Sequence, residues 1–136
     1  MIGYDGSDNS KRALTKAIEL AKSSDSRLII VVAVETAGHV AYAAGQSYEV
    51  FRNEMIAQAK NLLTEASDAA THAGIKVFAS VEEGRPADTI LARALEYKVD
   101  LIVVGSRGIR GVERLLMGSV SSAIVSRSQC DVLVVK

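Results

Sequence analysis

The sequence has no tryptophan, a single proline and a single cysteine, and its 16 basic residues are balanced by 16 acidic ones. The lone Cys130 excludes an internal disulfide. A formal net charge of 0 provides no overall field that would attract nucleic acid or an anionic membrane. The longest unbroken apolar run, residues 28–34, is far shorter than the roughly 18 residues that suggest a membrane span. The N-terminus also lacks the basic and apolar segments of a signal peptide, so we expect a cytoplasmic location.

The composition is that of an ordinary globular protein, with 49% hydrophobic and 24% charged residues. A chain of 136 residues can form one domain around one core but is too short for two. Because it has no linker, no low-complexity segment and no internal repeat, we expect a single domain over residues 1–136.

Short apolar runs alternate with segments of helical periodicity. We predict strands at residues 1–4, 27–34, 75–81, 100–104 and 132–136. We predict helices at residues 10–23, 47–73 and 86–98, and a last one that opens at Gly118-Ser119 and runs to Arg127. Residues 36–46 have no clear period and are interpreted as a loop. Five strands joined by four helical crossovers indicate an α/β fold, with a mostly parallel sheet covered by helices on both faces.

The long helix and the first strand of this pattern each carry a specific expectation. The apolar side of the long helix is predicted to consist of Phe51, Met55, Leu62, Ala66 and Ala69. Only four residues precede Asp5, whereas strands usually run about 5–6 residues. Either the first strand is short, or the natural chain begins upstream of Met1.

The stretch "GSRGIRGVERLLMGS", residues 105–119, follows a buried-looking strand and has the chemistry of a phosphate site. Ligands of open parallel sheets bind outside the carboxyl ends of the strands. Gly105 and Gly108 allow backbone N–H groups to line a concavity, and Gly118-Ser119 opens a helix whose N-terminus favours an anion. Hydroxyl donors and positive charge lie nearby in Ser119, Ser121, Arg107, Arg110 and Arg114. The alternative is that these glycines only turn the chain.

Two familiar phosphate loops are excluded, because the stretch matches neither Gly-x4-Gly-Lys-Ser/Thr nor Gly-x-Gly-x-x-Gly. A second polar loop, "YDGSDNS", follows the first predicted strand. Its Asp5 either caps the following turn or contacts a ligand.

The spacing Gly105-x2-Gly108-x9-Gly118-Ser119 resembles the ATP-binding signature of the universal stress protein family. The resemblance extends along nearly the whole chain, through "YDGSDNS", "EEGRPADTIL", "DLIVVGSRG", "LLMGSVSSAIV" and "VLVV". One departure is Asp131, which stands where family members usually have proline. The resemblance implies a five-stranded parallel sheet in the order 3-2-1-4-5, which places the ends of strands 1 and 4 side by side.

The resemblance also implies a set of ligand contacts. Asp5 would lie beside the base or ribose of ATP, and the backbone of Val34 would meet the adenine edge. The ribose and phosphates would be held by Gly105, Gly108, Gly118 and Ser119, with Arg107, Val120 and Ser121 completing the cradle. A Mg²⁺ or Mn²⁺ ion would bridge the phosphates, and the strand at residues 132–136 would pair with its copy in a homodimer.

No residue pattern indicates fast turnover. Neither His39 nor His72 lies in a segment that would supply a base to Ser119 or Ser121, and neither has other residues at metal-ligand spacing. We therefore expect ATP to act as a bound signal, hydrolysed slowly at most. Two alternatives stay open: a nucleotide-independent scaffold of the same fold, and a weak ATPase or ATP pyrophosphatase-like enzyme suggested by the similarity of "DGSDNS" to a Ser-Gly-Gly-x-Asp-Ser loop.

Overall fold

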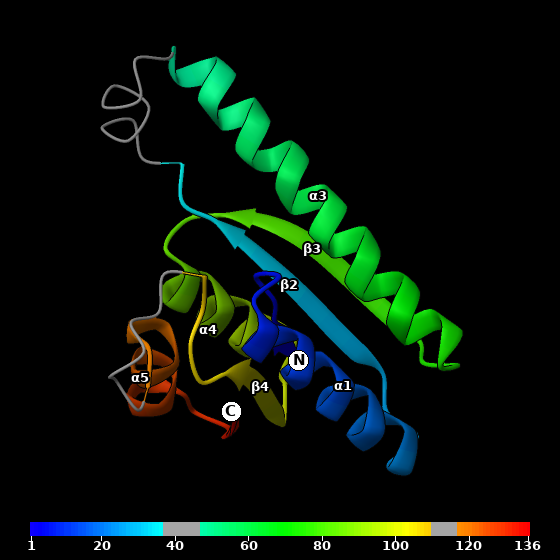
Figure 1. Cartoon of the computed structure of the whole chain (residues 1–136). Helices are drawn as coiled ribbons and strands as arrows, with labels where there is room; N and C mark the ends of the chain where they lie inside the picture. Colours follow the sequence, from blue (N-terminus) through cyan, green and yellow to red (C-terminus); the bar gives the residue numbers. More distant parts are fainter. Residues whose placement is uncertain (37–46, 110–116) are drawn as a thin grey trace.

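The computed structural model describes residues 1–36, 47–109 and 117–136 (Figure 1). The elements in chain order are β1 (Ile2–Gly3), α1 (Asp8–Ser23), β2 (Leu28–Val34), α3 (Tyr48–His72), β3 (Val77–Glu83), α4 (Pro86–Glu96), β4 (Leu101–Gly105), α5 (Ser119–Arg127) and β5 (Asp131–Val135). The predicted alternation of strands and helices is therefore confirmed.

The strands form one five-stranded sheet in the order β3-β2-β1-β4-β5, and every neighbouring pair is parallel. This is the sheet order that the resemblance implied. β1 is central but short, with Ile2 opposite Ile30 on one side and Val103 on the other. Backbone hydrogen bonds extend it at both ends, because the amine of Met1 donates to Leu101 at 2.8 Å and Tyr4 N–H donates to Val31 at 2.9 Å.

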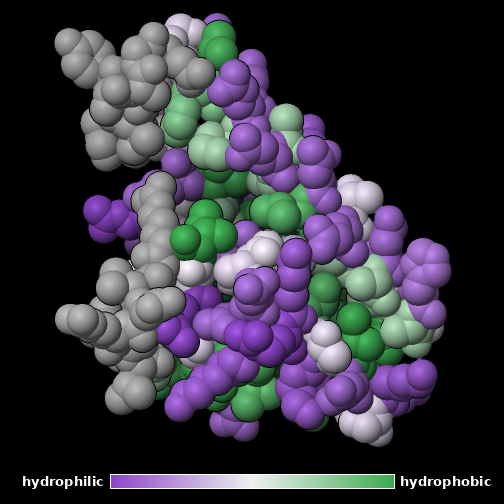
Figure 2. Space-filling view, viewed as in Figure 1, coloured by the Kyte–Doolittle hydropathy of each residue, from purple (hydrophilic) through white to green (hydrophobic). Residues whose placement is uncertain are grey.

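Helices cover both faces of the sheet, which explains why β2 and β4 read as continuous apolar runs. On one face, α1 and α3 bury alanines against alternate strand residues such as Ile2, Ile30 and Val32. On the other face, α4 and α5 contribute Ile90 and Ile124 to a second cluster with Met1, Val31, Ile102 and Val104. Figure 2 shows mainly polar side chains on the visible outer surface, with apolar groups between α3 and the rest of the molecule.

Helix α3 has 25 residues and continues past the strand ends at its N-terminal half (Figure 1). Its buried residues are Ala59, Ala66 and Ala70, so the prediction that Ala69 faces the core is wrong: Ala69 is exposed. Successive residues of a helix point in directions about 100° apart. The packing of α3 against β2 and β3 therefore decides that Ala70, and not Ala69, faces the core. Within the described ranges, no helix combines the length and apolar composition needed to cross a bilayer.

Candidate functional site

The loops that follow β1 and β4 are fastened together at the carboxyl ends of these adjacent strands. The carboxylate of Asp5 accepts two backbone hydrogen bonds, one from Ser7 N–H at 3.0 Å and one from Ile109 N–H at 3.1 Å. The first is the local turn cap that the sequence suggested, and the second spans 104 residues of chain. Ser7 adds a weaker contact, because its Oγ lies 3.4 Å from the carbonyl oxygen of Arg107.

Close packing explains why glycine stands at residues 105 and 108. A Cβ at Gly108 would overlap the carboxylate Oδ2 of Asp5. A Cβ at Gly105 would lie 2.8 Å from the carbonyl carbon of Asn9, at the start of α1. Both glycines therefore let the two loops approach each other, and their role in holding a ligand stays a prediction.

Ser106 connects the loop after β4 to three other elements. It is 1% exposed, and its N–H donates to Val135 in β5 at 2.6 Å. Its hydroxyl accepts from the side-chain amide of Asn9 in α1 at 3.2 Å. Its carbonyl accepts from Gly118 N–H at 2.7 Å and from the hydroxyl of Ser121 at 2.9 Å, both at the start of α5. Neither Ser106 nor Asn9 stands out in the sequence, because two polar residues separated by 97 positions give no local signal.

The N-terminus of α5 opens beside this junction. Its N-cap is Gly118, no side chain caps the helix, and its first turn contains no acidic residue. Ser119 is exposed, whereas the Ser121 hydroxyl is directed at Ser106 and Gly118. The N–H groups of this turn, with the partial positive charge of the helix end, form a surface that favours an anion.

Val34 is the last residue of β2. Its side chain lies in the core, and its carbonyl accepts from Gly84 N–H at 2.9 Å, so that oxygen belongs to the β2–β3 ladder. Peptide groups alternate along a strand, and the carbonyl of Val31 faces β1 by accepting from Tyr4. The peptide groups of Ala33 therefore face the side on which β1 has ended. The Val34 carbonyl is thus engaged within the sheet, and the strand register points to Ala33 as the residue whose peptide groups face outward. Contact between the backbone of Val34 and a ligand stays a prediction.

Tyr4 directly precedes Asp5, and its side chain is buried in the cluster that α1 and α3 form with the sheet. Its hydroxyl donates to Glu65 of α3 at 3.3 Å, and burial, together with the Glu65 carboxylate, raises the pKa of Tyr4 to about 12. The phenol is therefore neutral at physiological pH. Arg110 and Arg114 lie outside the described residues, so their predicted proximity to the site stays a prediction, and His39 also lies outside them.

The model of the universal stress protein family matches residues 1–136. The chain belongs to this family. It is 35% identical over its full length to universal stress protein YxiE from Bacillus subtilis (strain 168), covering 97% of that protein. It is also 35% identical to a universal stress protein from Methanocaldococcus jannaschii, covering 80% of it.

Solved structures of the family have the same fold. A universal stress protein in complex with cAMP is 34% identical, with a TM-score of 0.70, and the match covers 98% of this chain and 92% of that one. The universal stress protein UspA from Lactobacillus plantarum has a TM-score of 0.86 at 22% identity, and the match covers 99% and 96% of the two chains.

Side chains that could bind a metal do not gather around the α5 N-terminus in the part of the chain that the structure describes. Residues 1–36, 47–109 and 117–136 contain no cluster of three or more His, Cys, Asp or Glu side chains arranged for a metal. His72 lies at the C-terminal end of α3, where its ring nitrogen is 2.7 Å from the carbonyl of Asp68. It is the last residue of α3, so its ring lies beside the carbonyl groups of the helix C-terminus.

Proposed function

We propose that this protein binds an adenine nucleotide, with ATP as the preferred ligand, and acts in the cytoplasm as a nucleotide-dependent stress-response module. The observation that carries this proposal is the junction of the Asp5 turn, the loop at residues 105–109 and the uncapped N-terminus of α5. The three segments meet at the carboxyl ends of β1 and β4, where parallel sheets bind their ligands.

The proposed ligand lies along this junction from β2 toward α5. The peptide groups of Ala33 meet the adenine edge, beside Val34, and Asp5 approaches the base or ribose. The ribose rests on the loop that contains Gly105 and Gly108. The phosphates accept hydrogen bonds from the backbone N–H groups of the first turn of α5, at Ser119, Val120 and Ser121, beside Gly118, with Arg107 supplying positive charge.

A Mg²⁺ or Mn²⁺ ion fits this arrangement as a bridge between phosphate oxygens. Among the described residues at the α5 N-terminus, the exposed hydroxyl of Ser119 is an oxygen that could support such an ion. Bound in this way, the ion would neutralise phosphate charge.

The proposed role requires that bound ATP is hydrolysed slowly or not at all. The Ser121 hydroxyl donates to backbone carbonyls, and His72 is at the other end of the sheet. Neither arrangement provides a base for a nucleophile or a group that orients water. ATP then serves as a signal whose presence changes the surface around α5.

The 34%-identical relative solved with cAMP supports an adenine nucleotide as the ligand class and makes cAMP the second candidate. Titration calorimetry with Mg-ATP, AMP and cAMP, with Mg-GTP as the control, separates the candidates. Mass spectrometry of nucleotide released from the denatured, freshly purified protein identifies any copurified ligand. ATP bound more tightly than cAMP supports the proposal; the reverse order favours the cyclic nucleotide. No heat with any adenine nucleotide favours a nucleotide-independent scaffold.

We further propose that β5 forms a homodimer by antiparallel pairing with its copy, over residues 132–136. β5 is an edge of the sheet, and because Val135 accepts from Ser106, the peptide groups of Val132 and Val134 face away from β4. Lys136 lies beyond the strand, with its carbonyl accepting from Arg12 at 3.0 Å. Sedimentation of a Val134→Pro variant tests the pairing, since proline removes an outward N–H without breaking the β4 ladder. An unchanged dimer would contradict it.

A further inference from the structure

β3 is the other edge of the sheet, and its outer side is unpaired among the described residues. Lys76 accepts from Leu28 N–H, and Gly84 donates to Val34, each at 2.9 Å. Peptide groups alternate, so those of Val77, Ala79 and Val81 face away from β2. The register is continuous from Leu28 opposite Val77 to Val34 opposite Glu83. No bulge or proline blocks this edge, which makes it a template for another strand.

One face of β3 also offers apolar surface beside the free edge. The side chains of Val77, Ala79 and Val81 pack toward α1 and α3, so Phe78 is directed to the opposite face. There Phe78 is 50% exposed, and its ring centroid lies 5.2 Å from that of Tyr97. Tyr97 is the C-cap residue of α4, which packs on β2. A strand added to this edge would therefore lie next to the aromatic pair of Phe78 and Tyr97.

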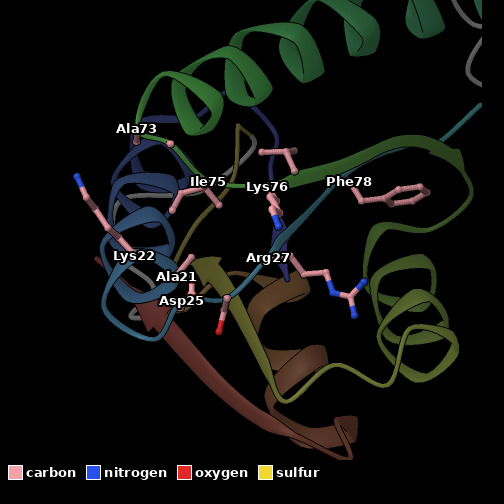
Figure 3. Close-up of a pocket in the computed structure, with 11 residues that line it drawn as sticks. Ala21, Lys22, Asp25, Arg27, Ala73, Ile75, Lys76 and Phe78 are labelled. Atoms are coloured by element: carbon pink, nitrogen blue, oxygen red, sulfur yellow. The ribbon is translucent and has the colours of Figure 1, made fainter.

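A groove of about 760 Å³ lies at the amino ends of β2 and β3, at the end of the sheet opposite the glycine loop (Figure 3). Ala21, Ala73 and Ile75 are among its apolar lining residues. Lys22, Arg27 and Lys76 also line it and form no ion pair with other described residues, while Asp25 is its one carboxylate. Figure 3 shows Arg27 and Phe78 extending toward the same end of the groove. The groove thus has an excess of positive charge beside the free edge.

We propose that β3 binds an extended acidic segment of a partner protein by strand addition. The segment's peptide groups pair with Val77, Ala79 and Val81, and its carboxylates face Lys22, Arg27 and Lys76. One of its apolar side chains packs on Phe78. The backbone provides affinity and the groove provides the preference for acidic sequences. Since the glycine loop lies at the other end of the sheet, a nucleotide and this segment can be bound together.

A second copy of β3 fits this surface less well than an acidic partner. The carboxylates at the end of β3 are already held, Glu82 by Arg93 at 2.6 Å and Glu83 by the Nε of Arg52 at 2.8 Å. Pairing β3 with its own copy would therefore bring no free carboxylate from that strand to the three cations.

Fluorescence anisotropy with the full chain tests the proposal. The probe is a fluorescein-labelled peptide with a run of glutamates followed by alternating valine and threonine, and the matched probe has lysines in place of the glutamates. We expect only the glutamate peptide to bind and to slow hydrogen exchange at the amides of Ala79 and Val81. Equal affinity for both peptides, no binding of either, or unchanged exchange at these amides would overturn the proposal.

Two variants separate the charges from the strand edge. Arg27→Glu combined with Lys76→Glu should weaken binding roughly tenfold, which is within the range for two exposed ion pairs, whereas Lys60→Glu on the exposed side of α3 should not. Ala79→Pro should abolish binding but keep the β2 ladder, because the N–H it removes faces outward. Circular dichroism verifies that each variant is folded. Binding that the charge reversal does not affect would overturn the proposal, because the groove would then not be the site. A concentration-dependent dimer that the same reversal dissociates would overturn it in favour of a second copy of this chain.

Discussion

The carboxylate of Asp5 occupies the space that a side chain at residue 108 would need, so Gly108 and Asp5 are in direct contact across the junction of two loops. The same carboxylate accepts the N–H of Ile109 at 3.1 Å. The turn after β1 and the loop after β4 therefore behave as one unit, and a change in either residue is expected to displace the other.

Gly108→Ala should destabilise the protein by about 1–3 kcal/mol, because the new methyl group must push Asp5 away. Urea unfolding measures this effect, and Ile109→Ala, at a side chain that is 75% exposed, is the control. In an Asp5→Ala background the same glycine substitution should cost little. Equal costs in both backgrounds would show that the Asp5 contact is not the cause.

Asp5→Asn keeps one oxygen but replaces the other by an NH₂ group, which cannot accept a hydrogen bond. Either Ser7 or Ile109 then loses its acceptor, and we expect about 1 kcal/mol of destabilisation together with weaker ATP binding. Asp8→Asn, an exposed position in the first turn of α1, is the matched control. Calorimetric titration with ATP and urea unfolding of both variants provide the comparison. Equal ATP affinity and equal stability of the two variants would contradict a role for Asp5 in joining the two loops.

Gly118→Val should reduce ATP affinity tenfold or more, since a bound phosphate would lose about one charge-assisted hydrogen bond to the α5 N-terminus. The fold should persist, because a Cβ at this position would lie 3.4 Å from the Ser106 carbonyl oxygen, and φ is −77°. Gly118→Ala, which adds only that Cβ, should have a smaller effect. Unchanged ATP affinity in a folded valine variant would show that the phosphates do not bind at the N-terminus of α5.

Ser106→Ala should cost about 1–3 kcal/mol, because the buried amide of Asn9 loses its acceptor. Combining it with Asn9→Ala should cost less than the sum of the two single substitutions, since no donor is then left unpaired. A double-mutant cycle in urea measures the coupling. Additive costs would mean that the hydrogen bond contributes nothing to stability.

Alkaline pH should destabilise the protein through Tyr4. The pKa of this phenol is raised from 10.0 to about 12 in the folded state, so the folded protein holds its proton more tightly than the unfolded chain. The stabilising effect is complete below pH 10 and is lost as the pH rises from about 10 to 12. Tyr4→Phe should therefore flatten the fall of unfolding free energy over this interval. Tyrosinate absorbance should also lose its component of highest pKa, and an unaltered titration curve would contradict the assignment.

Local patterns predicted the elements well, because burial on both faces gives continuous apolar strands and a single core-facing side gives helical periodicity. The error at Ala69 arose where those patterns are weakest, along a long alanine-rich helix whose exact rotation depends on how closely the sheet approaches. The choice between Val34 and Ala33 required the register of β2 against two neighbours, which spacing alone does not contain.

The sequence by itself determined the α/β class and the family and predicted the glycine loop as the place for an anion, because each depends on short motifs whose residues are near one another along the chain. Only the tertiary structure decided that Gly108 contacts Asp5, that Ser106 joins α1, α5 and β5, and that Lys22, Arg27 and Lys76 share one groove. These relationships depend on which strands become neighbours and in what register, and sheet pairing brings together residues that the chain holds far apart.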